Sequence, residues 1–164
     1  MFPKQKFTIT TYLSPDDVQK KLIEVVEPPP TRIQFQWKRS DKLYRGQIGE
    51  HSFKIARIIY YRNSFLPQIE GRINAHGRGS QIEIEMKLHR FVLIFICVWL
   101  SMVGQFVLMA LMVLFQEEFE PAFLVPVGMF IFGLALPWIG FIPEAKGSKK
   151  FLLELFQGIE ENPL

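Results

Sequence analysis

The chain of 164 residues carries 19 Lys and Arg against 16 Asp and Glu, and its single cysteine, Cys97, excludes a disulfide framework. A net charge of +3 is too small to favour nucleic acid as a partner, because such partners are held by many basic residues. Hydrophobic residues make up 49% of the chain and concentrate between positions 91 and 142, which leaves enough chain for one small domain.

The first 30 residues predict a strand followed by a helix. Residues 6–13 alternate between apolar and polar side chains, which is typical of a half-buried strand. The positions on one face of this strand are Phe7, Ile9, Thr11 and Leu13. Ser14 is a good helix N-cap, Pro15 suits the first helical turn, and three prolines at 28–30 should end the helix.

A meander of strands follows, and we expect it to complete a small antiparallel sheet packed by one or two helices. The expected strands are 32–38, 43–49, 51–60, 68–75 and 81–89, the last two joined by a glycine-rich turn at 76–80. The hairpin residues expected to face the core are Ile69, Ile73, Ile82, Ile84, Met86 and Leu88. Its outward residues are Arg72 and Asn74 opposite Glu83, Glu85 and Lys87, which are complementary in charge. Residues 1–90 are therefore predicted to form a cytosolic α+β domain.

Two apolar segments predict a two-helix transmembrane hairpin over 91–142. Residues 91–115 contain no charged side chain, residues 123–142 form the second expected span, and an acidic loop at 116–122 separates them. About 20 apolar residues suffice to cross a bilayer core of about 30 Å. Residues 1–90 carry 16 Lys and Arg against nine Asp and Glu. The positive-inside rule then predicts an integral membrane protein with both termini in the cytoplasm.

The remaining residues, 143–164, predict a cytosolic tail. We expect a polar exit at 144–148 and a short amphipathic helix at 149–161. This helix has Leu152, Leu155, Phe156 and Ile159 on one side. It carries several acidic residues that anionic headgroups would repel, so we expect it to pack on the sheet and not in the lipid interface.

Several motifs between residues 44 and 100 resemble those of a group of small uncharacterised bacterial membrane proteins with two spans. These motifs are the segment YRNSFLP at Tyr61–Pro67, Gly71, the turn Gly77–Gly79 and Met86–His89 just before the first span. The resemblance implies the paired membrane hairpin, and it implies no activity, cofactor or functional residue. The order of strands and helices is also similar to that of helix-grip lipid-binding folds, as an analogy of fold alone.

Catalytic and metal-binding motifs are absent from the sequence. The chain contains no GxSxG, HExxH or phosphate-binding loop motif. Its three histidines, His51, His76 and His89, lie far apart, with no second ligand at metal-binding spacing. We therefore expect no enzyme activity, no metal and no cofactor.

Basic residues near the expected membrane surface are the first candidate binding site. Arg57 falls on the inward face of its strand, where an unpaired charge would be costly. It lies close in sequence to Arg62 and Asn63, and Arg72 follows on the next strand. One interpretation is a solvated face that satisfies the positive-inside rule. The other is a site that holds an anionic lipid headgroup or the carboxylate of a partner.

The expected spans contain a second set of candidates. Gln105 is the only strongly polar side chain in the first span, so it should face the second helix or another protein. Small residues that would let helices approach each other closely are Gly104, Gly128 and Gly133. By the same reasoning we expect the partners to be the lipid bilayer and either another membrane protein or further copies of this chain in a homo-oligomer.

Two functions remain open from the sequence. The first is a non-catalytic accessory or scaffold subunit that docks a larger membrane complex through its hairpin and its cytosolic sheet. The alternative is a binding module at the membrane interface that encloses a lipid or another apolar ligand. A cavity of several hundred Å³ between sheet and helix would favour the binding module, and a filled core would favour the scaffold.

Overall fold

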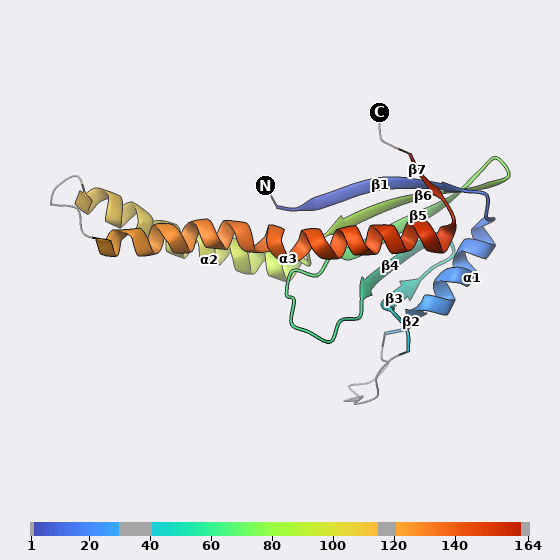
Figure 1. Cartoon of the computed structure of the whole chain (residues 1–164), viewed down its shortest axis with the longest axis horizontal. Helices are drawn as coiled ribbons and strands as arrows, with labels where there is room; N and C mark the ends of the chain where they lie inside the picture. Colours follow the sequence, from blue (N-terminus) through green and yellow to red (C-terminus); the bar gives the residue numbers. More distant parts are fainter. Residues whose placement is uncertain (1, 30–40, 115–120, 162–164) are drawn as a thin grey trace.

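The computed structural model describes residues 2–29, 41–114 and 121–161, which form one sheet and three α-helices (Figure 1). The strands are β1 (Lys4–Thr11), β2 (Val26–Glu27), β3 (Tyr44–Ile48), β4 (Ser52–Arg57), β5 (Gln68–His76), β6 (Gly79–Lys87) and β7 (Ile159–Glu161). The helices are α1 (Pro15–Val25), α2 (Arg90–Leu114) and α3 (Leu124–Phe156), with a 3₁₀ turn, η1 (Pro121–Phe123), before α3. The α+β class is confirmed.

The sheet is larger than expected and is mixed. In the described residues it has seven strands in the order β2-β3-β4-β5-β6-β1-β7. All neighbours are antiparallel except β2 and β3, which are parallel, so the expectation of a small, purely antiparallel sheet was wrong. The expected strand at 32–38 and almost all of the acidic loop at 116–122 lie outside the described residues.

Local sequence signals are confirmed where strand, cap and turn lie close together in the chain. Ser14 caps α1, since its hydroxyl oxygen accepts a hydrogen bond from the backbone N–H of Asp17 at 3.2 Å. The helix ends at Val25, before the prolines, because Val26 is already extended and pairs with β3. In the hairpin of β5 and β6, Arg72 lies opposite Glu83 and Ile73 opposite Ile82, which is the expected register.

The helix α3 is the main departure from expectation. The helix is 33 residues long. Instead of ending near residue 142, it passes through Pro137 and Pro143 and ends at Phe156 (Figure 1). The expected polar exit at 144–148 is therefore helical, and the short helix predicted after it is the end of α3. Residues at helical spacing in this half are buried against the sheet. They are Phe141, Ala145, Ser148, Leu152 and Phe156.

The end of α3 explains why the expected helix stops before residue 161. Gln157 adopts a left-handed conformation (φ 50°), and the N–H of Gly158 donates to the carbonyl of Leu153 at 3.2 Å. This Schellman motif turns the chain back into β7, which pairs with β1. The hydroxyl of Thr11 in β1 donates to the carbonyl of Phe156 at 2.6 Å and satisfies one more helix-end acceptor.

The two long helices pack on each other and project away from the sheet (Figure 1). A Cβ atom placed on Gly133 of α3 would lie 2.1 Å from the Trp99 ring of α2. The absence of a side chain at Gly133 therefore leaves room for this ring to pack against α3. Both helices are long and apolar enough to cross a membrane, on length and composition alone. Most of their large apolar side chains outside this contact are exposed.

The core lies between the sheet and the helices α1 and α3, which cover the same face. Val18 and Leu22 of α1 and Leu152 and Phe156 of α3 are fully buried there. Phe53 of β4 is directly opposite Gly71 of β5, and its ring covers the glycine and lies 6.5 Å from the Phe156 ring. The opposite face of the sheet is polar, and no described helix covers it.

The contact between Phe53 and Gly71 yields a test of the core. A Cβ atom on Gly71 would lie 2.1 Å from the Phe53 ring, so Gly71→Ala should destabilise the fold by about 1–3 kcal/mol through overpacking. The control is Gly147→Ala in α3, where the nearest atom is 3.7 Å away and alanine is the better helix former. Thermal unfolding in detergent should show a lower midpoint for the first variant and an unchanged or higher one for the control. Equal midpoints would contradict this packing.

Candidate functional site

The connection between β4 and β5, residues 58–67, contains the YRNSFLP segment and joins the sheet to α3 where the helices leave it. Asn63 makes two hydrogen bonds in this junction. Its Nδ2 donates to the carbonyl of Gly140 in α3 at 2.9 Å, and its Oδ1 accepts from the N–H of Phe65 at 2.9 Å. A Cβ on Gly140 would lie 2.8 Å from Phe65, so only glycine permits this approach. The segment is thereby fixed against α3.

A buried carboxylate lies beside this contact. Glu144 of α3 is only 7% exposed, and its Oε2 is 3.1 Å from Nη1 of Arg57 at the end of β4. The hydroxyl of Tyr61 donates to the other oxygen, Oε1. Both oxygens of the buried carboxylate are therefore satisfied, one by a cation and one by a hydroxyl. We call Arg57, Tyr61, Asn63, Gly140 and Glu144 the junction cluster.

Tyr44 of β3 lies next to the junction cluster on the inner face of the sheet. Burial raises the pKa of its hydroxyl, while Ser148 and Arg57 act in the opposite direction. The Ser148 hydroxyl is itself completely buried and forms no hydrogen bond of normal geometry. A raised pKa keeps Tyr44 neutral at physiological pH, so this tyrosine is suited to packing and to donating a hydrogen bond.

The structure separates the four residues that the sequence grouped as one basic site. Arg57 and Asn63 belong to the junction cluster, and Arg62 is exposed in the same segment. Arg72 is on the other face of the sheet, opposite Glu83. The inward charge of Arg57 is paired with Glu144 of the same chain. Binding by Arg57 of a headgroup or of a partner's carboxylate, one of the two interpretations from the sequence, stays a prediction. The binding of a headgroup by Arg62 stays a prediction.

Glu144, Tyr61 and Gly140 were not among the residues selected from sequence. The sequence places Glu144 in the polar exit expected at 144–148, after the second apolar segment. A signal for its role does exist: an arginine at an inward strand position requires a carboxylate, and Glu144 shares the helical spacing of Phe141 and Ser148. Only the continuation of α3 makes that partner available.

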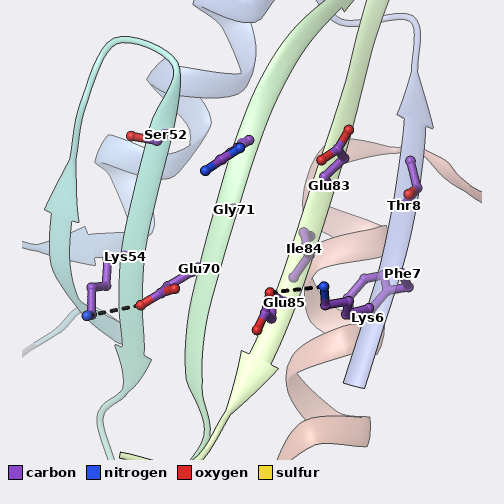
Figure 2. Close-up of a pocket in the computed structure, with 11 residues that line it drawn as sticks. Lys6, Phe7, Thr8, Ser52, Lys54, Glu70, Gly71, Glu83, Ile84 and Glu85 are labelled. Carbon is purple, nitrogen blue, oxygen red and sulfur yellow. Dashed lines mark ion pairs between the residues drawn. The ribbon is translucent and has the colours of Figure 1, made fainter. Parts of the chain in front are cut away.

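The uncovered face of the sheet is hollowed into a polar groove of about 740 Å³ (Figure 2). We call this surface the open face. Its charged lining residues come from four adjacent strands, β1, β6, β5 and β4. They are Lys6, Lys54, Glu70, Arg72, Glu83 and Glu85. Thr8 and Ser52 add hydroxyl groups at the two sides. Equal numbers of acidic and basic side chains suit a polar protein surface better than a purely anionic ligand.

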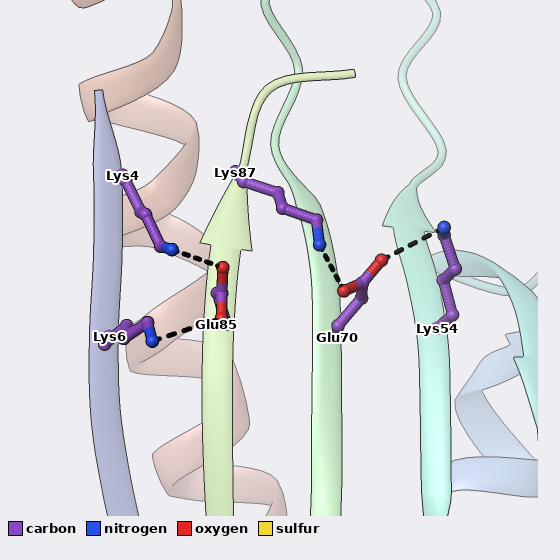
Figure 3. A network of polar contacts seen from close by, with 6 residues as sticks. All are labelled: Lys4, Lys6, Lys54, Glu70, Glu85 and Lys87. Carbon is purple, nitrogen blue, oxygen red and sulfur yellow. Dashed lines mark hydrogen bonds and ion pairs between the residues drawn. The ribbon is translucent and has the colours of Figure 1, made fainter. Parts of the chain in front are cut away.

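Each of two carboxylates on the open face contacts two lysines on neighbouring strands (Figure 3). Glu70 contacts Lys87 and, at 3.0 Å, Lys54; Glu85 contacts Lys4 at 2.7 Å and Lys6 at 3.5 Å. Hydrogen bonding to Lys87 is the main cause that lowers the pKa of Glu70 below its ordinary value of 4.5. Hydrogen bonding to Lys4 is likewise the main cause that lowers the pKa of Glu85 below its ordinary value. The network therefore stays charged over the physiological pH range.

The structure places two of the four residues expected between the two long helices, Gly133 and Gly104, in the contact between α2 and α3. Gly133 packs against the Trp99 ring. A Cβ atom added to Gly104 would lie 3.5 Å from the Phe130 ring. Gly128 has open space around it, and Gln105 is exposed. Gln105 and Gly128 therefore do not form the contact between α2 and α3, because both point away from it.

Among the described residues, no group of three or more His, Cys, Asp or Glu side chains could hold a metal ion. Comparison of the chain with models of protein families, with curated proteins and with solved structures finds no match.

The pair of Arg57 and Glu144 allows a double-mutant test. Arg57→Met leaves the buried carboxylate with the Tyr61 hydroxyl alone and should destabilise the fold by about 1–3 kcal/mol, reduced from the fully buried case because Arg57 is 42% exposed. The free energy of unfolding that Glu144→Gln removes should be smaller in the Arg57→Met background than in the native chain. Thermal unfolding of the four proteins measures this coupling. Strict additivity would show that the two side chains do not interact.

The lowered pKa values of Glu70 and Glu85 give a dependence on pH. Stability from a lowered carboxyl pKa is fully present above the unfolded value of 4.5 and is lost as the pH falls through the folded value. The unfolding midpoint should therefore fall with acidification below about pH 4.5, modestly, since both carboxylates are partly exposed and screened by solvent. Glu70→Gln should reduce this acid dependence, and identical pH curves would contradict the network.

Proposed function

We propose that the protein is a non-catalytic integral-membrane scaffold whose helical hairpin spans the bilayer and whose sheet docks a larger membrane complex on the cytoplasmic side. One observation carries this proposal: α3 is a single helix with an exposed apolar first half and a second half buried in the sheet. The orientation of the sheet relative to the hairpin is therefore fixed by one continuous element.

The exposure of the two long helices supports a membrane location. The most apolar part of each is only 11% buried in α2 and 17% buried in α3, whereas the core helix of a soluble protein would be mostly buried. Contiguous apolar surface of this extent is rare on soluble monomers. The acidic and basic residues lie outside these stretches, as expected for a hairpin with both ends in the cytoplasm.

The filled interior supports a scaffold over a ligand carrier. The binding-module alternative requires a cavity between the sheet and α3. Phe53, Leu152 and Phe156 occupy that space and are at most 3% exposed. The open face is an accessible hollow on the sheet, and its balanced charges fit a protein surface with complementary charges.

The test is isolation of the tagged full-length protein from native membranes in mild detergent, followed by mass spectrometry of proteins and lipids. A larger membrane protein should co-purify in stoichiometric amount. The variant Lys54→Gln with Arg72→Gln removes two cations from the open face and should release most of this partner. The control, Lys20→Gln with Arg78→Gln, removes the same charge from exposed positions on α1 and the β5–β6 turn and should retain it.

Two results would overturn the scaffold proposal. The protein could elute without a partner protein and with one enriched lipid, which is the outcome for a binding module. The partner could also remain fully bound to the open-face variant while the unfolding midpoint of that variant matches the control. Docking would then not use the open face.

A further inference from the structure

Gln105 presents an amide on the outer surface of α2. It is the sixteenth residue of a helix that begins at Arg90, so it lies about 22 Å along the helix axis, beyond the middle of the span. The residue is exposed, and within the described part of the chain its amide has no hydrogen-bond partner. Ser101, another exposed polar side chain of α2, donates its hydroxyl to the carbonyl of Cys97 at 2.8 Å, so within the described part of this helix after Arg90, Gln105 is the polar side chain left without a partner.

The inference rests on the proposed membrane location. If α2 spans a bilayer, Gln105 lies in hydrocarbon, where an amide without a partner is unfavourable. A glutamine side chain is too short to reach either interface from this depth. The helix α3 does not supply the partner, because α2 faces it through the buried residues Ile96 and Val103 and through Trp99. The partner must come from another molecule.

The residues around Gln105 form a continuous stripe opposite the face that contacts α3. Successive members are separated by four and three residues in alternation, and all are exposed. They are Phe91, Phe95, Val98, Met102, Gln105, Met109 and Met112. This spacing is the seam of a left-handed pair of helices, in which side chains of one helix fit between those of the other. Lipid would accept the apolar members equally well, so Gln105 is the member that distinguishes this stripe.

We propose that two copies of this chain associate through this stripe of α2, with the two Gln105 side chains hydrogen-bonded to each other. An amide carries a donor and an acceptor, so it is complementary to itself. Every copy inserts into the membrane in the same direction, so a symmetric pair has parallel α2 helices and brings Gln105 opposite Gln105. A single polar residue in an apolar seam also sets the register of the pair.

Cysteine cross-linking in liposomes tests the pairing. In full-length protein with Cys97→Ala, a cysteine at Met102 lies on the stripe, and a cysteine at Leu111 is also exposed but lies off it. Oxidation in phosphatidylcholine vesicles should link Met102→Cys between copies and leave Leu111→Cys mainly uncoupled. Adding Gln105→Leu to Met102→Cys should lower the cross-linked fraction by about threefold, as expected for one interhelical hydrogen bond in lipid. Gln105→Asn keeps the amide and should restore much of the cross-linking.

Each other outcome overturns a definite part of the argument. If alkaline carbonate extracts the protein from membranes, the membrane location and this inference fail together. If the protein stays in the membrane but Met102→Cys does not cross-link, only the pairing fails. If Gln105→Leu cross-links as well as the parent, the amide does not determine the contact. If Met102→Cys in native membranes links to a different protein and not to a second copy, the partner assignment is wrong.

Discussion

The continuity of α3 is the constraint on which the rest of the structure depends. A proline inside a helix costs about 3 kcal/mol, and α3 contains Pro137 and Pro143. Full burial of a large apolar side chain contributes about 1.5–3 kcal/mol, and α3 buries Phe141, Leu152 and Phe156. Burial of these three side chains against the sheet therefore outweighs the cost of Pro143, and the helix continues where its sequence would otherwise end it. The short strand β7 exists because the helix then ends beside β1.

The junction cluster follows from this continuity and defines how the sheet meets the hairpin. A buried ion pair adds little net stability, since desolvation of both charges opposes their attraction. Its effect is directional: Glu144 is satisfied only if Arg57 and Tyr61 reach it from the β4–β5 connection. Asn63 and Gly140 add a contact four residues earlier on the same helix. Together they favour one orientation of the sheet on α3 over rotated alternatives.

The parts of the fold that were predictable are those encoded within a few neighbouring residues. The Ser14 cap and the register of the β5–β6 hairpin need only local patterns, and both were predicted. The parallel pairing of β2, the strand β7 and the partner of Arg57 depend on segments far apart in the chain. Strand β7 and the partner of Arg57 could not be derived because both require α3 to pass Pro143, which local propensity opposes. The pairing of β2 with β3 could not be derived because no pattern within either short segment specifies it. The sequence did mark Arg57 as a charge in need of a partner, without identifying Glu144.

The lysines of the open face meet two electrostatic requirements at once. Glu70 and Glu85 lie opposite each other on β5 and β6, and this repulsion would weaken the sheet without Lys54, Lys87, Lys4 and Lys6 around them. Lys4 and Lys87 are also paired at the end of the sheet where β6 leads into α2. With Arg90 they place excess positive charge beside the first residue of the proposed span, as the positive-inside rule requires. The charges that stabilise the sheet are therefore also those that favour its proposed position on the cytoplasmic side.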